Sequence, residues 1–173
     1  SYIPMAFLDS ETIASDLCLI IPKATHYHFG VLSSVMHMAW VRYVAGRLKS
    51  DFRYSNQIVY NNFPWPLDPT DKQVQSVEVA TDAVLAAREK FPDASLADLY
   101  DPVTMPPTLR EAHAKLDRAV DAAYACPEPG RRGKRSFASE ADRIAFLFDL
   151  YNQYTTLLPA VPKPRRRARR KPA

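Results

Sequence analysis

The sequence has only four glycines, and no set of them completes the spacing of a phosphate-binding loop. In the G-x-G-x-x-G and G-x-x-x-x-G-K-[ST] patterns, glycines let backbone N–H groups surround a phosphate. A nucleotide-binding glycine loop is therefore excluded from these 173 residues. Apolar runs such as 17–22 are also far shorter than the roughly 20 residues that cross a bilayer. We therefore expect no membrane-spanning segment and no membrane partner.

Cysteine is scarce as well. Cys18 and Cys126 are far apart and form neither a disulfide framework nor a metal-ligand spacing, which favours a reducing cytoplasm as the location. Cys18 lies in an apolar run and is predicted to be a small buried residue. The chain has no charged-then-apolar leader, so we expect no secretory signal in these residues. It also has no initial methionine, so we expect it to be a piece of a longer protein.

Positive charge is concentrated at one end of the chain. The formal net charge is +4, and seven basic residues lie between positions 163 and 171 with no acidic residue among them. Because a proline-rich basic end buries little apolar area, 159–173 is predicted to be a disordered tail. Two roles stay open for this tail: non-specific attraction to phosphates, and a solubilising or incidental extension.

The strand-like runs lie in residues 1–66. The runs 2–8 and 15–22 are rich in Ile, Leu, Phe and Tyr, which is typical of short buried strands, and 57–60 is predicted to be a further strand. A helix is expected after Ser33 or Ser34, because serine is a common N-terminal cap, and it should end near residue 45.

Helix signals dominate residues 67–158. Thr70 and Gln73 have the spacing of a capping box, and prolines 106 and 107 suit the first turn of a helix. The helices are predicted over 70–91, 95–100, 106–123 and 139–158. The apolar stripe of the third consists of Leu109, Ala112, Leu116, Val120 and Ala123.

The fold class that follows is α+β. A small β-rich part over 1–66 is followed by a helical bundle over 67–158. Within the bundle, 126–138 is predicted to be a flexible linker, because it is rich in proline, glycine and charge.

The segment 47–54 alternates in a way that predicts one strand. A period of two is typical of a strand with one packed face and one solvent face. The packed face would carry Leu48, Ser50, Phe52 and Tyr54. The solvent face would carry Arg47, Lys49, Asp51 and Arg53.

The mixed charges of this face suit the recognition of base edges. Lysine can donate to guanine O6 and N7, and aspartate can accept from cytosine N4. On one strand, the side chains of Lys49 and Asp51 would have roots roughly 6.5–7 Å apart, which lets both reach one base pair or two adjacent pairs. The alternative is a solvated edge strand whose charges neutralise one another. The predicted DNA-contacting residues are Arg47, Lys49, Asp51, Arg53, Tyr54 and Asn56.

Two other short patterns have weaker functional interpretations. His26 and His28 would share one face of a strand and could ligate a metal, but no nearby acid or cysteine completes a set, which favours a packing role. The run 62–65 is superficially like the [DN]-P-P-[YFW] loop of amino-methyltransferases. Because Phe63 replaces the first proline, an aromatic–proline anchor to the core is the favoured interpretation.

Longer strings resemble one known family. HMAWVR at 37–42, GRLKSDFRYS at 46–55 and IVYNNFPWP at 58–66 resemble the MmeI-like (type IIL) DNA adenine-N6 methyltransferases of bacterial restriction-modification systems. The later strings LADLYDP, MPPTLR and AH, which begin at positions 96, 105 and 112, are similar to the C-terminal helical region of that family.

The resemblance implies a place in a larger enzyme. Family members have an upstream S-adenosylmethionine-binding catalytic domain, a target-recognition domain and C-terminal helices, and some also carry a nuclease. The residues 1–66 would be the end of the recognition domain, and 67–158 the helices. The family's base-recognising pair would fall on Lys49 and Asp51, with a preference for guanine.

The family's catalytic N-P-P-Y motif is absent from these residues. The resemblance therefore implies no catalysis and no cofactor binding by this chain alone, while the parent enzyme would use S-adenosylmethionine. The expected partners are double-stranded DNA and the upstream methyltransferase domain of the same polypeptide. A helical protein-interaction module without DNA binding is the competing hypothesis, and a metal enzyme built on His26 and His28 is a distant third.

Overall fold

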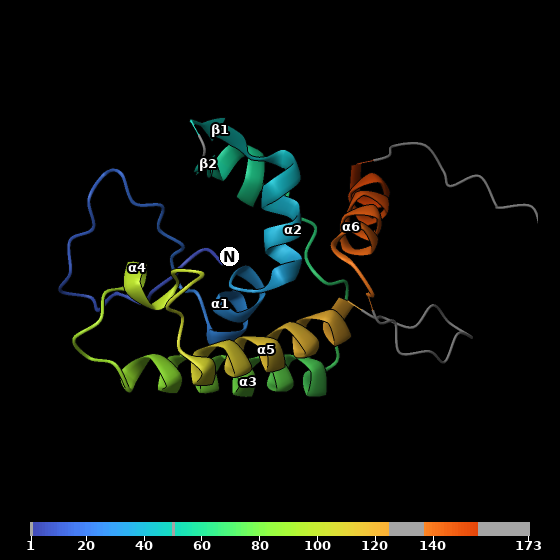
Figure 1. Cartoon of the computed structure of the whole chain (residues 1–173). Coiled ribbons are helices and arrows are strands. Elements are labelled where there is room, and N and C mark those ends of the chain that lie inside the picture. The colour runs from blue at the N-terminus through green and yellow to red at the C-terminus, as the bar shows by residue number, and fades with distance from the viewer. Residues whose placement is uncertain (1, 50, 125–136, 156–173) are drawn as a thin grey trace, which may run out of the picture.

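The computed structural model describes residues 2–49, 51–124 and 137–155 (Figure 1). This part of the chain is mostly helical with one two-stranded sheet, in agreement with the α+β class. The predicted tail at 159–173 and most of the predicted linker at 126–138 lie outside the described residues. The elements are α1 (His26–Leu32), α2 (Val35–Val44), β1 (Gly46–Leu48), β2 (Asp51–Arg53), the π-helix η1 (Asn56–Tyr60), α3 (Asp71–Glu89), α4 (Leu96–Leu99), α5 (Pro107–Tyr124) and α6 (Glu140–Thr155).

The side-chain caps at the helix starts confirm the predicted positions. The Ser34 hydroxyl accepts the backbone N–H of His37 at the start of α2. Thr70 and Gln73 form the predicted capping box of α3, in which each side chain accepts the other residue's backbone N–H. These bonds satisfy N–H groups that have no partner inside the helix. Similar pairs, Ser95 with Asp98 and Ser139 with Asp142, lie at the starts of α4 and α6.

The predicted strands at 2–8 and 15–22 are wrong. Residues 2–25 contain no helix and no strand, and in the described part of the chain only β1 and β2 form a ladder. A strand-like composition describes a fit to a pleated, half-buried surface, and here no neighbouring strand supplies that surface. Cys18, predicted to be buried, is exposed in this loop.

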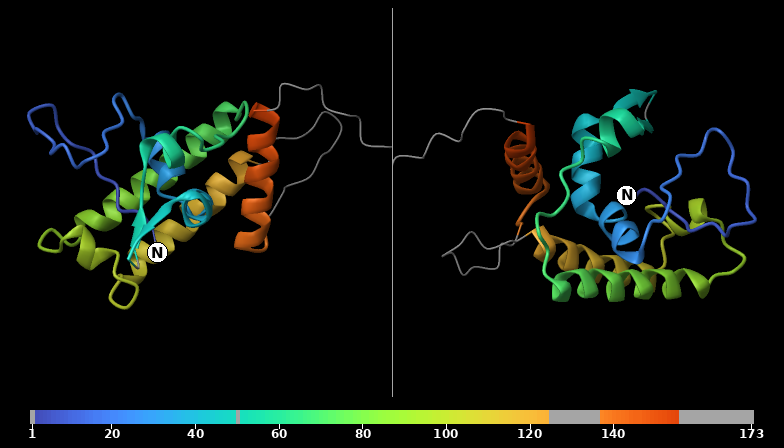
Figure 2. Two further views of the ribbon diagram at one scale, coloured as in Figure 1. Left: turned by 90° about the horizontal axis from the view of Figure 1, so that it is seen from above. Right: turned by 180° about the vertical axis from the view of Figure 1, so that it is seen from behind.

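The base of the molecule is an antiparallel pair of helices, α3 and α5, which lie side by side in the views of Figures 1 and 2. The predicted stripe of α5 is confirmed, since all five of its residues are buried. Helix α1 approaches α3 very closely at Gly30. A Cβ atom there would lie 2.4 Å from Thr81 Oγ1 and 2.7 Å from Val77 Cγ1. Only glycine permits this approach, so α1 is seated directly on α3.

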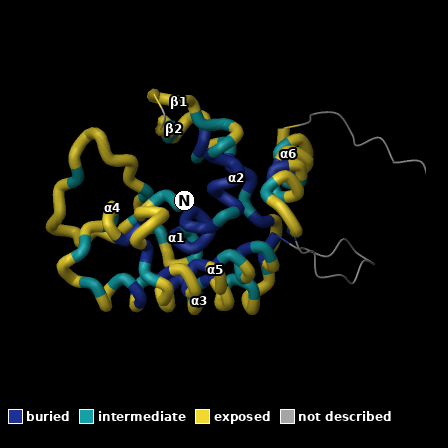
Figure 3. The backbone as a smooth tube through the Cα atoms, viewed as in Figure 1, coloured by how far each residue is buried: buried dark blue, intermediate teal, exposed yellow. Residues whose placement is uncertain are grey.

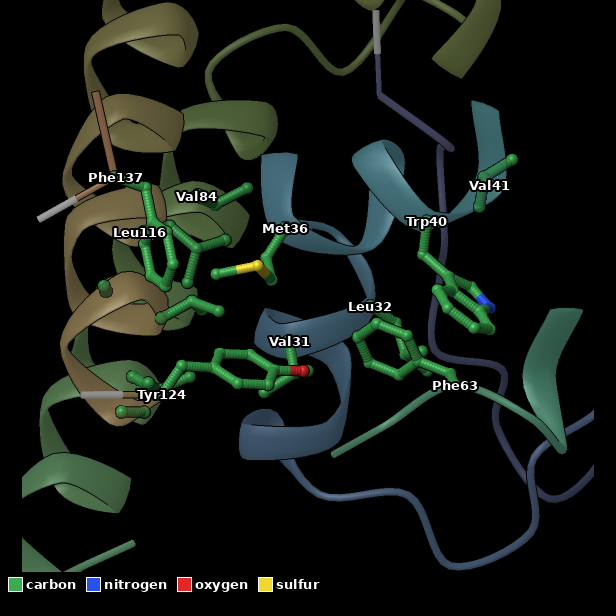
Figure 4. Close-up of a cluster of buried hydrophobic side chains, with 14 of the residues drawn as sticks. Val31, Leu32, Met36, Trp40, Val41, Phe63, Val84, Leu116, Tyr124 and Phe137 are labelled. Carbon is green, nitrogen blue, oxygen red and sulfur yellow. The ribbon is translucent and has the colours of Figure 1, made fainter. Parts of the chain in front are cut away.

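One core joins the two predicted domains. Trp40 and Met36 of α2 belong to the same buried cluster as Phe63 and as Leu116 and Tyr124 of α5 (Figure 4). Helix α6 packs on α2. The buried side chains of 1–66 and 67–158 pack into one core. This core marks no boundary between two separate domains, so the domain division at residue 66 stays a prediction. Among the described helices, none is long and apolar enough to cross a membrane.

Candidate nucleic-acid interface

The charged segment is a hairpin, and the prediction of one continuous strand is wrong. β1 pairs antiparallel with β2 in the register Gly46↔Arg53, Arg47↔Phe52 and Leu48↔Asp51. Only two positions separate Leu48 from Asp51, and Lys49 has φ 57°, in the left-handed region that turns use. The alternating pattern therefore contains a chain reversal, which a period of two cannot reveal.

The hairpin divides the predicted charges between two faces. Residues opposite one another in an antiparallel ladder point to the same face. Arg47 therefore shares a face with Phe52, and its guanidinium carbon lies 3.9 Å from the centroid of that ring. Asp51 and Arg53, two residues apart on β2, lie on the other face. The predicted single face of four charges is wrong, and the Lys49–Asp51 separation derived from one strand does not apply to the hairpin.

The charged groups remain accessible to a partner. Arg47, Lys49, Asp51 and Arg53 are all exposed. Within the described part of the chain, no ion pair joins Lys49 to Asp51. The two groups are thus neither buried in the interior nor locked onto each other. Figure 3 shows the hairpin as an exposed tip at the outer end of α2.

Helix α2 anchors the hairpin through a buried histidine. The Tyr54 hydroxyl, just after β2, lies 2.9 Å from His37 Nε2. His37 is fully buried, and burial lowers its pKa to about 3, so the ring is neutral at physiological pH. Burial also raises the pKa of Tyr54. Sequence analysis missed the role of His37, because only the fold brings positions 37 and 54 together.

A second anchor to α2 lies in the segment that follows the hairpin in the sequence. Trp40 Nε1 donates to the Val59 carbonyl at 3.0 Å, which ties η1 to α2. The predicted strand at 57–60 is wrong, because this segment is a π-helix. π-helical turns are rare and are frequent at functional sites. Asn56, at the start of η1, is exposed, and its Oδ1 accepts the Gln57 N–H at 2.8 Å.

The run 62–65 is an anchor to the core, as predicted. The Phe63 ring is buried, and the Pro64 carbonyl accepts the Tyr124 hydroxyl at 2.9 Å. The Trp65 carbonyl accepts the Tyr154 hydroxyl at the same distance. These bonds fasten the chain after η1 to α5 and α6. The hairpin is thus held between two fixed points, α2 before it and this run after it.

The two histidines of the metal hypothesis lie on helix α1, whereas the shared face that this hypothesis requires is that of a strand. His28 Nδ1 is 2.9 Å from the Thr25 hydroxyl at the start of the helix. His26 Nδ1 is 2.5 Å from Asp82 Oδ1 on α3. In the described residues, no group of three His, Cys, Asp or Glu side chains is placed to hold a metal ion. Each histidine thus has a hydrogen-bond partner within the protein.

Comparison with known proteins identifies two family matches. The target recognition domain of MmeI matches residues 1–67, and the C-terminal domain of MmeI matches residues 69–159. DNA methyltransferase A of Bacillus subtilis (strain 168) is 41% identical over 154 residues, which are 89% of this chain and 16% of that protein. The solved structure of the type IIL restriction-modification enzyme MmeI in complex with DNA is similar with a TM-score of 0.69 and 49% identity, over 78% of this chain and 17% of that one. The chain thus spans about one sixth of the length of these relatives.

Proposed function

This chain belongs to the MmeI family, and from that membership we propose that it is the DNA-recognition portion of a site-specific DNA (adenine-N6) methyltransferase of a restriction-modification system. One observation carries the proposal: an exposed hairpin with charges of both signs extends from a rigid helix, within the residues that match the target recognition domain. A two-stranded β-ribbon is narrow enough to enter the major groove.

The geometry of the hairpin tip supports different roles for Lys49 and Asp51. Lys49 lies in the turn, is exposed, and offers donors to guanine O6 and N7. Asp51 begins β2 and offers an acceptor to cytosine N4. These two residues are proposed to recognise one base pair from two sides of the turn, since they are not neighbours on one strand.

The two arginines have different surroundings. The guanidinium carbon of Arg47 lies 3.9 Å from the centroid of the Phe52 ring, and this cation–π contact restricts the side chain. Arg53 shares the face of Asp51 and is exposed. We assign both to the DNA backbone or to flanking bases, and Asn56 to the same contact surface. Tyr54 is assigned to positioning, because its hydroxyl is engaged by His37.

The catalytic chemistry belongs elsewhere in the proposed parent enzyme. These 173 residues contain neither the N-P-P-Y motif nor a cofactor glycine motif. We therefore expect S-adenosylmethionine and the target adenine to bind in an upstream domain of the same polypeptide. A cytoplasmic location and any nuclease activity of the parent stay predictions.

The proposal is tested on the target site of the full-length enzyme. Lys49→Ala and Asp51→Ala are expected to relax or change the preferred base at one position of the methylated site, which sequencing of methylated adenines measures. Loss of a correct bidentate contact should cost about 1–3 kcal/mol of discrimination at that position. Lys72→Ala and Asp93→Ala, which remove exposed charges at the start of α3 and after its end, are matched controls.

The outcome separates the proposal from the competing hypothesis. An unchanged methylated site in both hairpin variants would overturn the assignment. A helical protein-interaction module would show no duplex DNA binding that weakens as salt rises, whereas a DNA-recognition portion would.

A further inference from the structure

The loop over residues 6–21 exposes an unusual number of large apolar side chains. Ile13 is 95% exposed and Leu17 is 90% exposed. Four more apolar residues of the loop are over 40% exposed, namely Phe7, Leu8, Leu19 and Ile20. Figures 1 and 3 show the middle of this loop projecting away from α1, α3 and α5, while Phe7, near its start, stacks on Phe29 of α1 with 5.2 Å between ring centroids. Large apolar side chains exposed together on one loop indicate an interaction site more than singly scattered ones do.

The N-terminal end of the loop is held in place by contacts with α3 and α5. The exposed apolar residues therefore do not belong to a loose chain end. The Tyr2 hydroxyl donates to Asp117 Oδ2 at 2.9 Å, and the Tyr2 ring stacks on His113 at 4.2 Å between centroids. Arg88 on α3 donates to the Met5 carbonyl at 2.6 Å. The start of the loop is thus tied to both helices of the α3–α5 pair.

The second end of the loop is fixed as well. The Ile21 side chain is partly buried against the core, and Thr25 caps α1. Between the two ends, the backbone bonds of the loop are local, such as those from Thr12 N–H to the Asp9 carbonyl and from Cys18 N–H to the Ser15 carbonyl. The two ends of the loop are therefore held by the helices, while its middle is exposed.

The charge of the loop argues against DNA as its partner. Residues 6–21 contain Asp9, Glu11 and Asp16 and no lysine or arginine. The pKa of Asp9 is lowered by hydrogen bonds from Thr12 and Glu11, which keeps this carboxylate charged. Three negative charges without a positive one repel phosphates, so the loop suits an apolar protein surface with basic groups at its edge.

We propose that residues 6–21 dock onto the upstream part of the same polypeptide. This inference rests on the proposed function. The loop lies within the residues that match the target recognition domain, and this chain spans only about one sixth of the length of the matched relatives. A covalently joined partner is present at high effective concentration and can cover such a loop permanently. A second copy of the chain and a separate protein are the outcomes that the test must exclude.

The test uses the full-length polypeptide. Leu17 is replaced by a photo-activatable benzophenone amino acid, and Val103 carries the same group as the control, because it is 87% exposed and lies outside the loop. After irradiation and digestion, mass spectrometry identifies the partner. The expected result is a cross-link from position 17 to peptides upstream of residue 1 at the mass of one polypeptide. A product of twice that mass, a cross-link to another protein, or no more product than at position 103 would overturn the proposal.

A second variant pair keeps the inference separate from the proposed function. Leu17→Asp is expected to lower the midpoint of thermal unfolding of the full-length protein, while Val103→Asp leaves it unchanged. Equal midpoints for both variants would contradict docking. Neither readout uses the methylated site, so loss of docking with an intact role for Asp51 would overturn this inference alone.

Discussion

The hydroxyl of Tyr54 and Nε2 of His37 lie 2.9 Å apart and join the end of the hairpin to the buried face of α2. Among the residues that the structure describes, His37 Nδ1 has no hydrogen-bond partner, so the bond to Tyr54 is the polar contact that the buried ring makes there. The position of the proposed DNA-contacting hairpin therefore depends on a pair of residues that the DNA itself need not touch.

Removal of this bond should weaken both stability and DNA binding. Tyr54→Phe leaves a buried imidazole nitrogen unpaired, which should lower the free energy of unfolding by about 1–3 kcal/mol. Urea denaturation of the 173-residue chain measures this loss, and affinity for a cognate duplex measures the effect on the hairpin. Tyr43→Phe is the control, since Tyr43 is exposed on α2. Equal stability of the two variants would contradict an anchoring role for Tyr54.

The close approach of α1 to α3 predicts that Gly30→Ala is destabilising. The added methyl group would overlap Thr81 Oγ1 and Val77 Cγ1. Overpacking of this kind costs about 1–3 kcal/mol, which denaturant unfolding should detect. Gly46→Ala is the matched control, because the nearest atom to its added Cβ is Arg53 Cβ at 4.0 Å. If both substitutions had the same effect, the helices would be further apart than the structure places them.

The buried histidines predict that acid destabilises the fold. Burial lowers the pKa of His37 to about 3 and of His113 to about 4, both below the ordinary 6.5. As pH falls below 6.5, the unfolded chain therefore binds more protons than the folded chain, and the free energy of unfolding falls. Burial raises the pKa of Asp117 from 3.8 to about 6, so this residue opposes the histidines between those pH values.

Two histidines against one aspartate leave a net loss of stability in acid. One unbalanced proton corresponds to about 1.4 kcal/mol per pH unit, which urea denaturation at pH 7, 6 and 5 can measure. Asp117→Asn should make the loss steeper, because it removes the opposing group. Stability that rises between pH 7 and pH 5 would contradict the neutral, buried state of these rings.

Arg53 should contribute to affinity more than to sequence preference if it contacts the DNA backbone. Arg53→Ala is expected to weaken binding to all duplexes alike and to reduce the slope of log affinity against log salt by about one. Fluorescence anisotropy over a salt series measures that slope. Lys90→Ala, which removes an exposed charge at the end of α3, serves as the control. A changed base preference with an unchanged slope would assign Arg53 to a base.

Local signals in the sequence predicted α2 to α6, but they predicted neither α1 nor the π-helix η1. Capping residues such as Thr70 and Ser139 act within three positions of themselves, so their partners can be identified from spacing alone. The same holds for the apolar stripe of α5, since its period follows from the helix. The overall class and the family could thus be predicted from the residues.

The strands and the detailed geometry of the site could not be predicted in the same way. An alternating run has one pattern whether it is a single strand or a hairpin, and only the pairing of Leu48 with Asp51 shows the reversal. The apolar loop at 6–21 has a strand-like composition, yet the described residues offer it no strand to pair with. The His37–Tyr54 contact joins positions 17 apart and has no local signal.

The exposed tip of the hairpin has a consequence for how such a protein can change over evolution. Lys49, Asp51 and Arg53 fill no part of the core, while the residues that hold the hairpin in place, His37 and Trp40, lie beneath it. Mutations at the tip can therefore alter the proposed contacts with DNA without destabilising the fold. The protein could therefore evolve toward a new target site without passing through variants that fold poorly.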